Sequence, residues 1–169
     1  PLTLLSYNPF HVTGVEENIY LHQYSNYTVP RTRNGFKAFL IRFYKRFLRQ
    51  FIFPDRYKFS IPAYKKQIEK ILIAKNVDLV IIGMTPYSLY PLAKYIKELN
   101  PKIKVFVDLS DPFIDNAGNK NKLLFNRRNV KNFESKYLKF CDGVVVLNPS
   151  IKKLYDKVYK IAYKTYVIE

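Results

Sequence analysis

The chain has 169 residues, 48% of them hydrophobic, so it is long enough for one domain with a real core and is not a disordered tail. Its net charge of +16 and its 15 tyrosines and 13 phenylalanines favour an anionic partner, such as nucleic acid, an anionic membrane or a phosphorylated substrate. The single cysteine, Cys141, excludes an internal disulfide and a cysteine-based zinc cluster. No apolar run is long enough for a transmembrane helix, and the first residues do not have the pattern of a signal peptide.

Short apolar runs alternate with segments of helical periodicity, which is typical of βαβ units and a parallel sheet. Leu2 to Tyr7 is predicted as a first strand and Leu21 to Tyr27 as a weaker second strand. Between them, Glu16 to Tyr20 is predicted as the first turns of a helix, because a parallel crossover ordinarily contains one. Phe36 to Phe53 is predicted as a helix from large apolar residues at 3–4 spacing, and Pro54 ends it.

The rest of the chain shows the clearer alternation. The predicted strands are Asp78 to Ile82, Lys104 to Val107, Gly143 to Leu147 and Tyr163 to Ile168. The predicted helices are one capped by Ser60, one from Ser88 to Leu99, one from Lys120 to Phe140 broken near Arg127, and one capped by Asn148. Residues 1–169 are therefore predicted to form a single Rossmann-like, doubly wound α/β domain. Its mostly parallel sheet has about six strands, with helices on both faces.

Ligands of such sheets bind at the carboxyl ends of the strands. There, Asp108 and Asp111 are predicted to follow a strand, and carboxylates in this position can accept a proton or orient a hydroxyl group. The structural alternative is that Asp108 ends the strand while Asp111 or Asp115 caps a turn. No histidine stands beside these acids, so we expect no metal site.

Two further positions allow a functional and a structural interpretation. The loop Asn8 to Gly14 can present His11 and backbone amides to an anion, although a lone loop histidine is more often a surface residue. It has neither the GxGxxG nor the Walker A pattern. Cys141 follows an apolar stripe and is predicted to be a buried filler. The stripe consists of Val130, Phe133, Tyr137 and Phe140.

The segment from Arg31 to Lys58 contains nine basic residues and one acid, together with large apolar residues. A helix that is both basic and amphipathic suits an anionic membrane surface. We predict that this segment binds the membrane through Lys37, Arg42, Lys45, Arg46 and Arg49. The alternatives are a nucleic-acid surface, with phosphate contacts and aromatic stacking, and a solvated helix face.

Four passages in this order resemble the N-terminal half of GT-B glycosyltransferases, particularly glycosyltransferase family 4. They are SYNPFHVTG with VEENIY, VDLVIIGMTPYSLYPLAKYIKEL, KVFVDLSDPFIDN, and FESKYLKFCDGVVVLNPSIKKLYDK. The third is similar to the D-x-R-D-P-W-x-D-N signature of one branch, although Ser110 and Phe113 replace its Arg and Trp. The first loop has one glycine where many members have two. The sequence ends at KTYVIE, before the family's C-terminal nucleotide-sugar domain.

The resemblance implies the acceptor-side half of an enzyme that moves a sugar from a nucleotide-sugar donor to a membrane-associated or polysaccharide acceptor. It implies Asp108 and Asp111 as catalytic residues and His11 near the donor phosphates. The other expected cleft residues are Thr13, Gly14, Thr85, Pro86, Tyr87 and Asn148.

The resemblance also implies that no metal or other cofactor is needed and that this piece alone is inactive. We expect a cytoplasmic protein bound peripherally to the inner face of the membrane. The alternative function is a non-catalytic basic α/β domain that binds nucleic acid. A stand-alone Rossmann-like enzyme is disfavoured by the missing glycine fingerprint.

Overall fold

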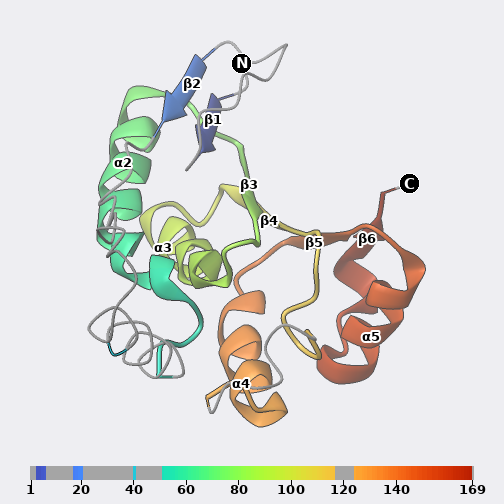
Figure 1. Cartoon of the computed structure of the whole chain (residues 1–169). Coiled ribbons are helices and arrows are strands. Elements are labelled where there is room, and N and C mark those ends of the chain that lie inside the picture. Colours follow the sequence, from blue (N-terminus) through green and yellow to red (C-terminus); the bar gives the residue numbers. More distant parts are fainter. Residues whose placement is uncertain (1–2, 7–16, 21–39, 41–50, 117–123, 169) are drawn as a thin grey trace. The chain divides into compact units, whose positions relative to one another are not determined.

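The computed structural model describes residues 3–6, 17–20, 40, 51–116 and 124–168 (Figure 1). The chain divides into two compact units, Pro1–Tyr44 and Lys45–Glu169, which are described separately.

In the first unit, β1 (Thr3–Ser6) pairs in parallel with β2 (Glu17–Tyr20), and Thr3 lies opposite Glu17. The prediction of a strand near residues 2–7 is confirmed, but the prediction of helical turns at Glu16 to Tyr20 is wrong. The backbone of these residues joins a parallel ladder, and Ile19 and Tyr20 belong to the residue types that favour strands. The strand predicted at Leu21 to Tyr27 lies outside the described residues.

The second unit is built on a parallel four-stranded sheet. Its strands are β3 (Leu79–Gly83), β4 (Lys104–Leu109), β5 (Gly143–Val146) and β6 (Thr165–Val167), in that spatial order. Each neighbouring pair is parallel. The prediction of an α/β fold with a parallel sheet is confirmed. The prediction of about six strands in that sheet is wrong, because β1 and β2 pair with each other and the described sheet of this unit has four.

The described part of this unit contains four helices: α2 (Ile61–Ala74), α3 (Tyr90–Leu99), α4 (Arg127–Leu138) and α5 (Pro149–Tyr159). Short 3₁₀ turns precede three elements: η1 (Arg56–Ser60), η2 (Tyr87–Leu89) and η4 (Ala162–Lys164). The predicted cap is confirmed at Asn148, whose side-chain oxygen accepts from the backbone N–H of Ile151 at 3.0 Å. Ser60 stands at the N-cap of α2 without a side-chain capping bond, because the chain enters directly from η1.

Two predicted helices are shorter than expected. Phe51 to Phe53 are not helical, so the helix predicted at Phe36 to Phe53 does not extend to its predicted end. Pro54 explains this, because proline disfavours a helical backbone in the residue before it. Similarly, α4 begins only at Arg127, where Asn126 accepts from the N–H of Asn129 at 2.8 Å. The remaining parts of both predicted helices lie outside the described residues, except that Leu40 is helical and exposed.

The three helices that connect the strands lie on one face of the sheet (Figure 1). The strands have the same order in the sheet as in the sequence. Because crossovers between parallel strands are right-handed, each connecting helix is then placed on the same side of the sheet. Val105, Val107 and Leu109 of β4 point to that side and are fully buried. Burial of such a side chain contributes about 1.5–3 kcal/mol. The expected cover of helices on both faces is therefore not seen among the described crossovers.

The opposite face of the sheet is apolar but exposed. Its exposed side chains include Leu79, Ile81 and Tyr166. The ring of Phe106 lies across Gly143 of the neighbouring strand, where an added Cβ would stand 2.2 Å from the Phe106 Cε1 atom. Glycine at this position is what allows the ring to lie flat against the sheet.

A buried lysine donates hydrogen bonds at the carboxyl-terminal end of α4, just before β5. The Nζ atom of Lys164 donates to the backbone oxygens of Leu138, at 2.8 Å, and Cys141, at 3.0 Å. The Leu138 carbonyl also accepts from the N–H of Cys141 at 3.1 Å, so the ammonium group supplies an additional donor just past the end of α4, where helix carbonyls lack intrahelical partners. Burial lowers the pKa of Lys164.

Candidate functional site at the carboxyl ends of β3 and β4

The two loops predicted to bind ligand leave the sheet side by side. Gly83, the last residue of β3, lies opposite Asp108 of β4, and the N–H of Met84 donates to the backbone oxygen of Asp108 at 2.8 Å. Asp108 is therefore part of the strand, which runs two residues further than predicted. Its side chain is half-buried and shares the open face of the sheet with Phe106.

Tyr87 connects the two loops. Its hydroxyl group lies 3.4 Å from the backbone oxygens of both Asp111 and Pro112, to which it can donate. The side-chain amide of Asn116 donates to the same hydroxyl oxygen at 2.9 Å. The Tyr87 ring also stacks on Phe113. Burial is the main cause that raises the pKa of Tyr87, so the hydroxyl stays protonated at neutral pH. The structure thus brings Tyr87 and the Asp111 loop together at the carboxyl ends of β3 and β4.

Phe113 of the Asp111 loop packs against a cluster of aromatic rings. The ring of Phe53 lies 5.7 Å from that of Phe113, 5.2 Å from Phe125 and 5.3 Å from Phe133. Two residues after Phe53, Asp55 accepts from the N–H of Ser88 at 2.9 Å, which joins the segment before α2 to the loop after β3. The loop is therefore held by a packed cluster, and edge-to-face pairs of this kind add about 0.5–1.5 kcal/mol each.

The acids of the second loop point outward. Asp111 and Asp115 are exposed, and Asp115 adopts a left-handed backbone with φ of 62°. A carboxylate oxygen of Asp115 lies 3.2 Å from the Arg127 guanidinium, at the start of α4. This ion pair joins Asp115 to the start of α4, whereas within the described part of the chain no ion pair involves Asp111. Asp111 is therefore the exposed acid of this loop that we consider as a candidate ligand-binding residue.

The other residues predicted to line the cleft differ in their exposure and in their contacts. Thr85 is exposed and Pro86 half-buried beside Tyr87. Asn148 is exposed at the carboxyl end of β5, but its side-chain oxygen is engaged in capping α5. The remaining predicted site residues lie outside the described residues: His11, Thr13 and Gly14 of the first loop, and the basic residues Lys37, Arg42, Lys45, Arg46 and Arg49.

Sequence reasoning missed a buried carboxylate, Glu134 of α4. Its Oε1 atom accepts from the hydroxyl groups of Tyr90 and Tyr155, both at 2.6 Å, and its Oε2 atom accepts from Tyr159 at 2.5 Å. Burial raises the pKa of Glu134 although these hydrogen bonds lower it. The sequence does contain one signal for its burial: Glu134 lies four residues after Val130 and four before Leu138, on the buried stripe of α4.

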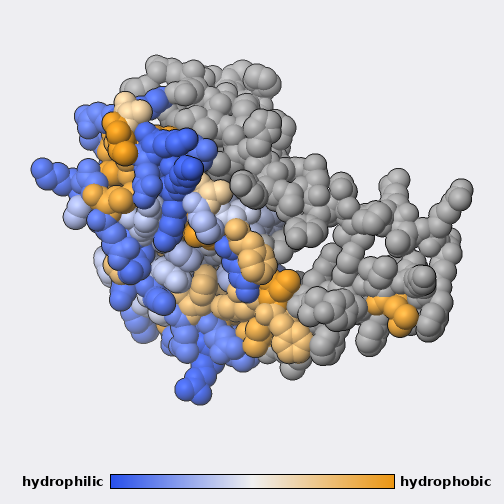
Figure 2. Space-filling view, turned by 90° about the vertical axis from the view of Figure 1, so that its left-hand side faces the viewer, coloured by the Kyte–Doolittle hydropathy of each residue, from blue (hydrophilic) through white to orange (hydrophobic). Residues whose placement is uncertain are grey.

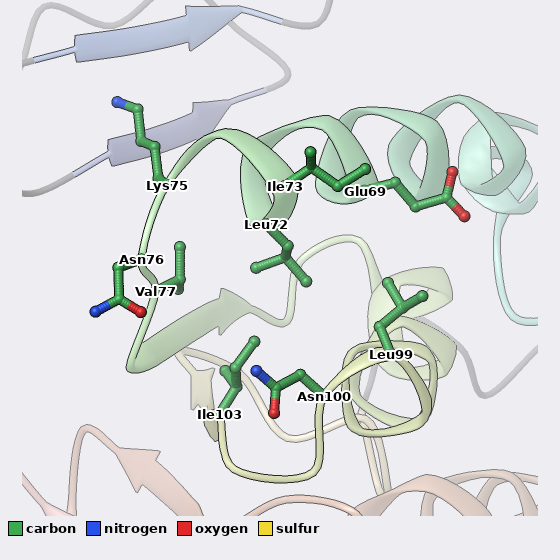
Figure 3. Close-up of a pocket in the computed structure, with 9 residues that line it drawn as sticks. All are labelled: Glu69, Leu72, Ile73, Lys75, Asn76, Val77, Leu99, Asn100 and Ile103. Atoms are coloured by element: carbon green, nitrogen blue, oxygen red, sulfur yellow. The ribbon is translucent and has the colours of Figure 1, made fainter.

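A pocket of about 460 Å³ lies at the opposite, amino-terminal edge of the sheet (Figure 3). It opens between the end of α2 and the turn from α3 to β4, with an apolar floor and a polar rim. The lining includes Leu72, Val77, Leu99 and Ile103, with Glu69, Lys75 and Asn100 at its rim. Because ligands of parallel sheets bind at the other edge, we place the candidate site at Tyr87 and Asp111.

Figure 2 shows the face of the molecule that carries α2. Hydrophilic side chains cover most of its described surface, and smaller hydrophobic patches lie between them. Lys66 and Lys70 of α2 are exposed, as is Ile73. Among the described residues, no helix is long and apolar enough to cross a membrane. Within the same ranges, no group of three or more His, Cys, Asp or Glu residues is placed to hold a metal ion.

No protein-family model matches the chain, and no curated protein or solved structure matches it either. The resemblance to glycosyltransferases is untested by these comparisons and stays a prediction.

Proposed function

We propose that this chain is the acceptor-side, N-terminal half of a glycosyltransferase, with the Rossmann-like fold of one half of the GT-B arrangement. The observation that carries the proposal is the bridge from Tyr87 to the Asp111 loop across the carboxyl ends of β3 and β4. Ligands of parallel sheets bind at this edge. The passages that resemble the family place their characteristic acids at the same edge.

In the proposed reaction, the hydroxyl oxygen of the acceptor attacks the anomeric carbon of the donor sugar. The bond from that carbon to the phosphate oxygen breaks, and the nucleotide leaves with the electron pair. Asp111 accepts the proton of the acceptor hydroxyl, and Asp108 lines the cleft beside it. The donor is bound mainly by a second domain, which the resemblance places after residue 169. The acceptor is membrane-associated or a polysaccharide, in keeping with the basic segment between Arg31 and Lys58.

The test compares the full-length protein with its Asp111→Asn variant for sugar transfer from a panel of nucleotide-sugars. Asparagine keeps the shape and most hydrogen bonds but cannot accept the proton. We expect at least about a hundredfold loss of transfer with near-normal melting. Activity within a few-fold of the unchanged protein, with a melting point lowered by several degrees, would instead make Asp111 structural. Absence of transfer from every donor by the full-length protein would overturn the proposed function.

Nucleic-acid binding is the second candidate, because Lys153 and Lys157 of α5 and Lys160, which follows it, are all exposed. Phosphate contacts make such binding steeply dependent on salt. Oligonucleotide binding that retains affinity near physiological salt would favour this candidate over the first.

A further inference from the structure

The solvent-facing surfaces of α4 and α5 are strongly basic. The two helices contain seven basic residues, and Lys139 and Lys160 directly follow them. The same two helices contain two acids, and each is engaged within the protein. Glu134 is buried and accepts hydrogen bonds from three tyrosines, and Asp156 accepts from the N–H of Ala162 at 3.3 Å. The exposed charge of both helices is therefore positive.

Most of these cations have no acidic partner. One ion pair of the described residues reaches this surface, from Arg127 to Asp115. No ion pair within the described ranges involves the six exposed cations that we call the α4–α5 basic face: Arg128, Lys131, Lys139, Lys153, Lys157 and Lys160. Because like charges repel one another and attract counter-ions, a ligand with several negative charges is attracted to such a face.

The order of the helices brings these cations together on one surface. The helices α3, α4 and α5 follow one another on one face of the sheet, so α4 lies between α3 and α5 (Figure 1). The ring of Phe133 packs edge-on against Tyr90 of α3, which identifies the side of α4 that faces α3. By the helical period, Arg128 and Lys131 lie on the opposite side of α4, toward α5. Their charges therefore add to those of the α5 lysines.

The α4–α5 basic face has polar side chains between its cations but no large apolar ones. Among the described residues, none of the exposed large hydrophobic side chains belongs to α4 or α5. Asn132, Ser135 and Ser150 are exposed there. Membrane-binding helices insert apolar side chains, and proteins that bind single-stranded nucleic acids stack the bases on aromatic rings. A surface of cations, amides and hydroxyl groups is instead suited to an acidic glycan, which offers both negative charges and hydroxyl groups.

The basic face begins beside the candidate site. The first residue of α4, Arg127, contacts Asp115 of the loop that carries Asp111, with 3.2 Å between the guanidinium and the carboxylate oxygen. From there the 12 residues of α4 extend over about 18 Å. Cations that are spread over this length suit a chain with repeated charges better than a single small anion.

We propose that the α4–α5 basic face binds an acidic glycan chain and directs it to the Asp111 loop. The cations attract the negative groups of the chain, and the polar side chains between them hydrogen-bond to its hydroxyl groups. The identification of this chain as the acceptor of sugar transfer rests on the proposed function, whereas the binding of the glycan does not.

Titration calorimetry of the 169-residue chain with an oligosaccharide of galacturonic acid tests the binding. We expect binding at physiological salt that weakens as salt is raised, because salt screens exposed charges. A neutral glucose oligosaccharide of the same length should not bind. Equal affinity for the two oligosaccharides, or binding of neither, would overturn the proposal.

A triple variant tests the face itself. Its substitutions are Arg128→Gln, Lys131→Gln and Lys153→Gln, all at exposed positions, so we expect the fold to be retained. Binding of the acidic oligosaccharide should weaken by at least about tenfold. The control of equal charge replaces three exposed lysines outside the face, Lys66, Lys70 and Lys102, with Gln and should bind nearly as tightly as the unchanged chain. Equal weakening in both variants would show that net charge alone attracts the glycan, and would overturn the proposal.

Two other ligands test the choice of partner. They are a double-stranded DNA oligonucleotide and anionic vesicles that contain phosphatidylglycerol. Weaker binding of both than of the acidic oligosaccharide at physiological salt supports the glycan. Tighter binding of either one, lost in the triple variant but kept in the control, would assign the face to that ligand and overturn the proposal.

Sugar transfer by the full-length protein separates this inference from the proposed function. With an acidic acceptor, the triple variant should raise KM by at least about tenfold while kcat stays within a few-fold, because these cations bind the chain away from the reacting atoms. Glycan binding by a full-length protein that transfers no sugar would support the basic face and refute the proposed function. Sugar transfer with a KM that the triple variant leaves unchanged would refute the role of the basic face alone.

Discussion

The rings of Tyr87 and Phe113 stack with their centroids 4.2 Å apart and their planes at 19°. The first ring follows β3 and the second follows β4, so this contact joins two loops that are 26 positions apart in the chain. Because the Tyr87 hydroxyl also contacts the same loop, the residue combines an apolar and a polar attachment.

Substitutions of Tyr87 separate these two attachments. Tyr87→Phe keeps the stacked ring and loses the hydroxyl, so we expect a loss of about 0.5–1.5 kcal/mol in the free energy of unfolding. Tyr87→Ala also removes the ring and should cost at least about 2 kcal/mol. Urea denaturation of both variants measures the difference. Equal losses in the two variants would show that the ring contact adds nothing.

Asp142 is predicted to make the protein sensitive to acid. Its carboxylate lies 2.6 Å from the Lys97 ammonium group and accepts from the N–H of Val105 at 2.8 Å. Partial burial alone would raise the pKa of Asp142, but these partners outweigh it and the pKa is lowered. The stabilisation is therefore complete above the unfolded pKa of about 3.9 and is lost as the pH falls through the folded value.

Urea denaturation between pH 5 and pH 2 should accordingly show the free energy of unfolding falling below about pH 4. Asp142→Asn should be less stable at neutral pH and should lose less stability over this range. Asp78→Asn, at an exposed acid, is the control and should keep the full slope. A slope that Asp142→Asn leaves intact would assign the acid sensitivity to other groups.

Cys141 is predicted to be unreactive in the folded protein. Its side chain is buried, as its position after an apolar stripe predicted, and burial raises the pKa of the thiol to about 12. The reactive thiolate is therefore scarce at pH 8 and hidden from solvent. We expect a chromogenic disulfide reagent to label the native chain at least about a hundredfold more slowly than the chain in denaturant. Immediate labelling of the native chain would contradict the buried placement.

Binding to anionic vesicles tests the predicted membrane segment. Exchanging Arg42, Lys45, Arg46 and Arg49 for Gln should weaken binding by several kcal/mol at low salt, since each cation contributes about 1 kcal/mol. A control of equal charge exchanges Lys152, Lys153 and Lys157 of α5 and Lys160, the residue that follows the helix, for Gln. Vesicle sedimentation measures both. Equal weakening in the two variants would mean that only net charge matters.

The sequence was sufficient to predict the strands of the larger sheet to within one or two residues. Continuous apolar runs such as that of β5 belong to buried parallel strands, and Asn148 before Pro149 is a strong local signal for a helix start. Both features depend only on residues that are close together in the chain, so a single sequence is enough to predict them. The end of β4 was missed because Asp108 is polar, although its backbone still pairs with the chain after β3.

The hydrogen bonds of Glu134 come from residues that are distant in the chain, so no local sequence pattern predicts them. Tyr90 lies 44 residues before it and Tyr155 lies 21 residues after it. Their convergence follows from the order of the strands, which composition and periodicity do not specify. The predicted apolar stripe of α4 is confirmed at Val130, which is buried, whereas Phe133 and Tyr137 are half-buried and the rest of the buried face is formed by Glu134 and Leu138.

The apolar open face of the four-stranded sheet has a consequence for the behaviour of the protein in solution. Parallel sheets in soluble proteins are covered on both sides, and each Å² of apolar surface left in water forfeits about 25 cal/mol. Leu79, Ile81 and Tyr166 are about half or more exposed on this face. The chain is therefore expected to self-associate through this face and to increase the fluorescence of dyes that bind exposed hydrophobic surface. Crystallisation and binding assays need a partner for this face before any association can be attributed to the loops that carry Tyr87 and Asp111.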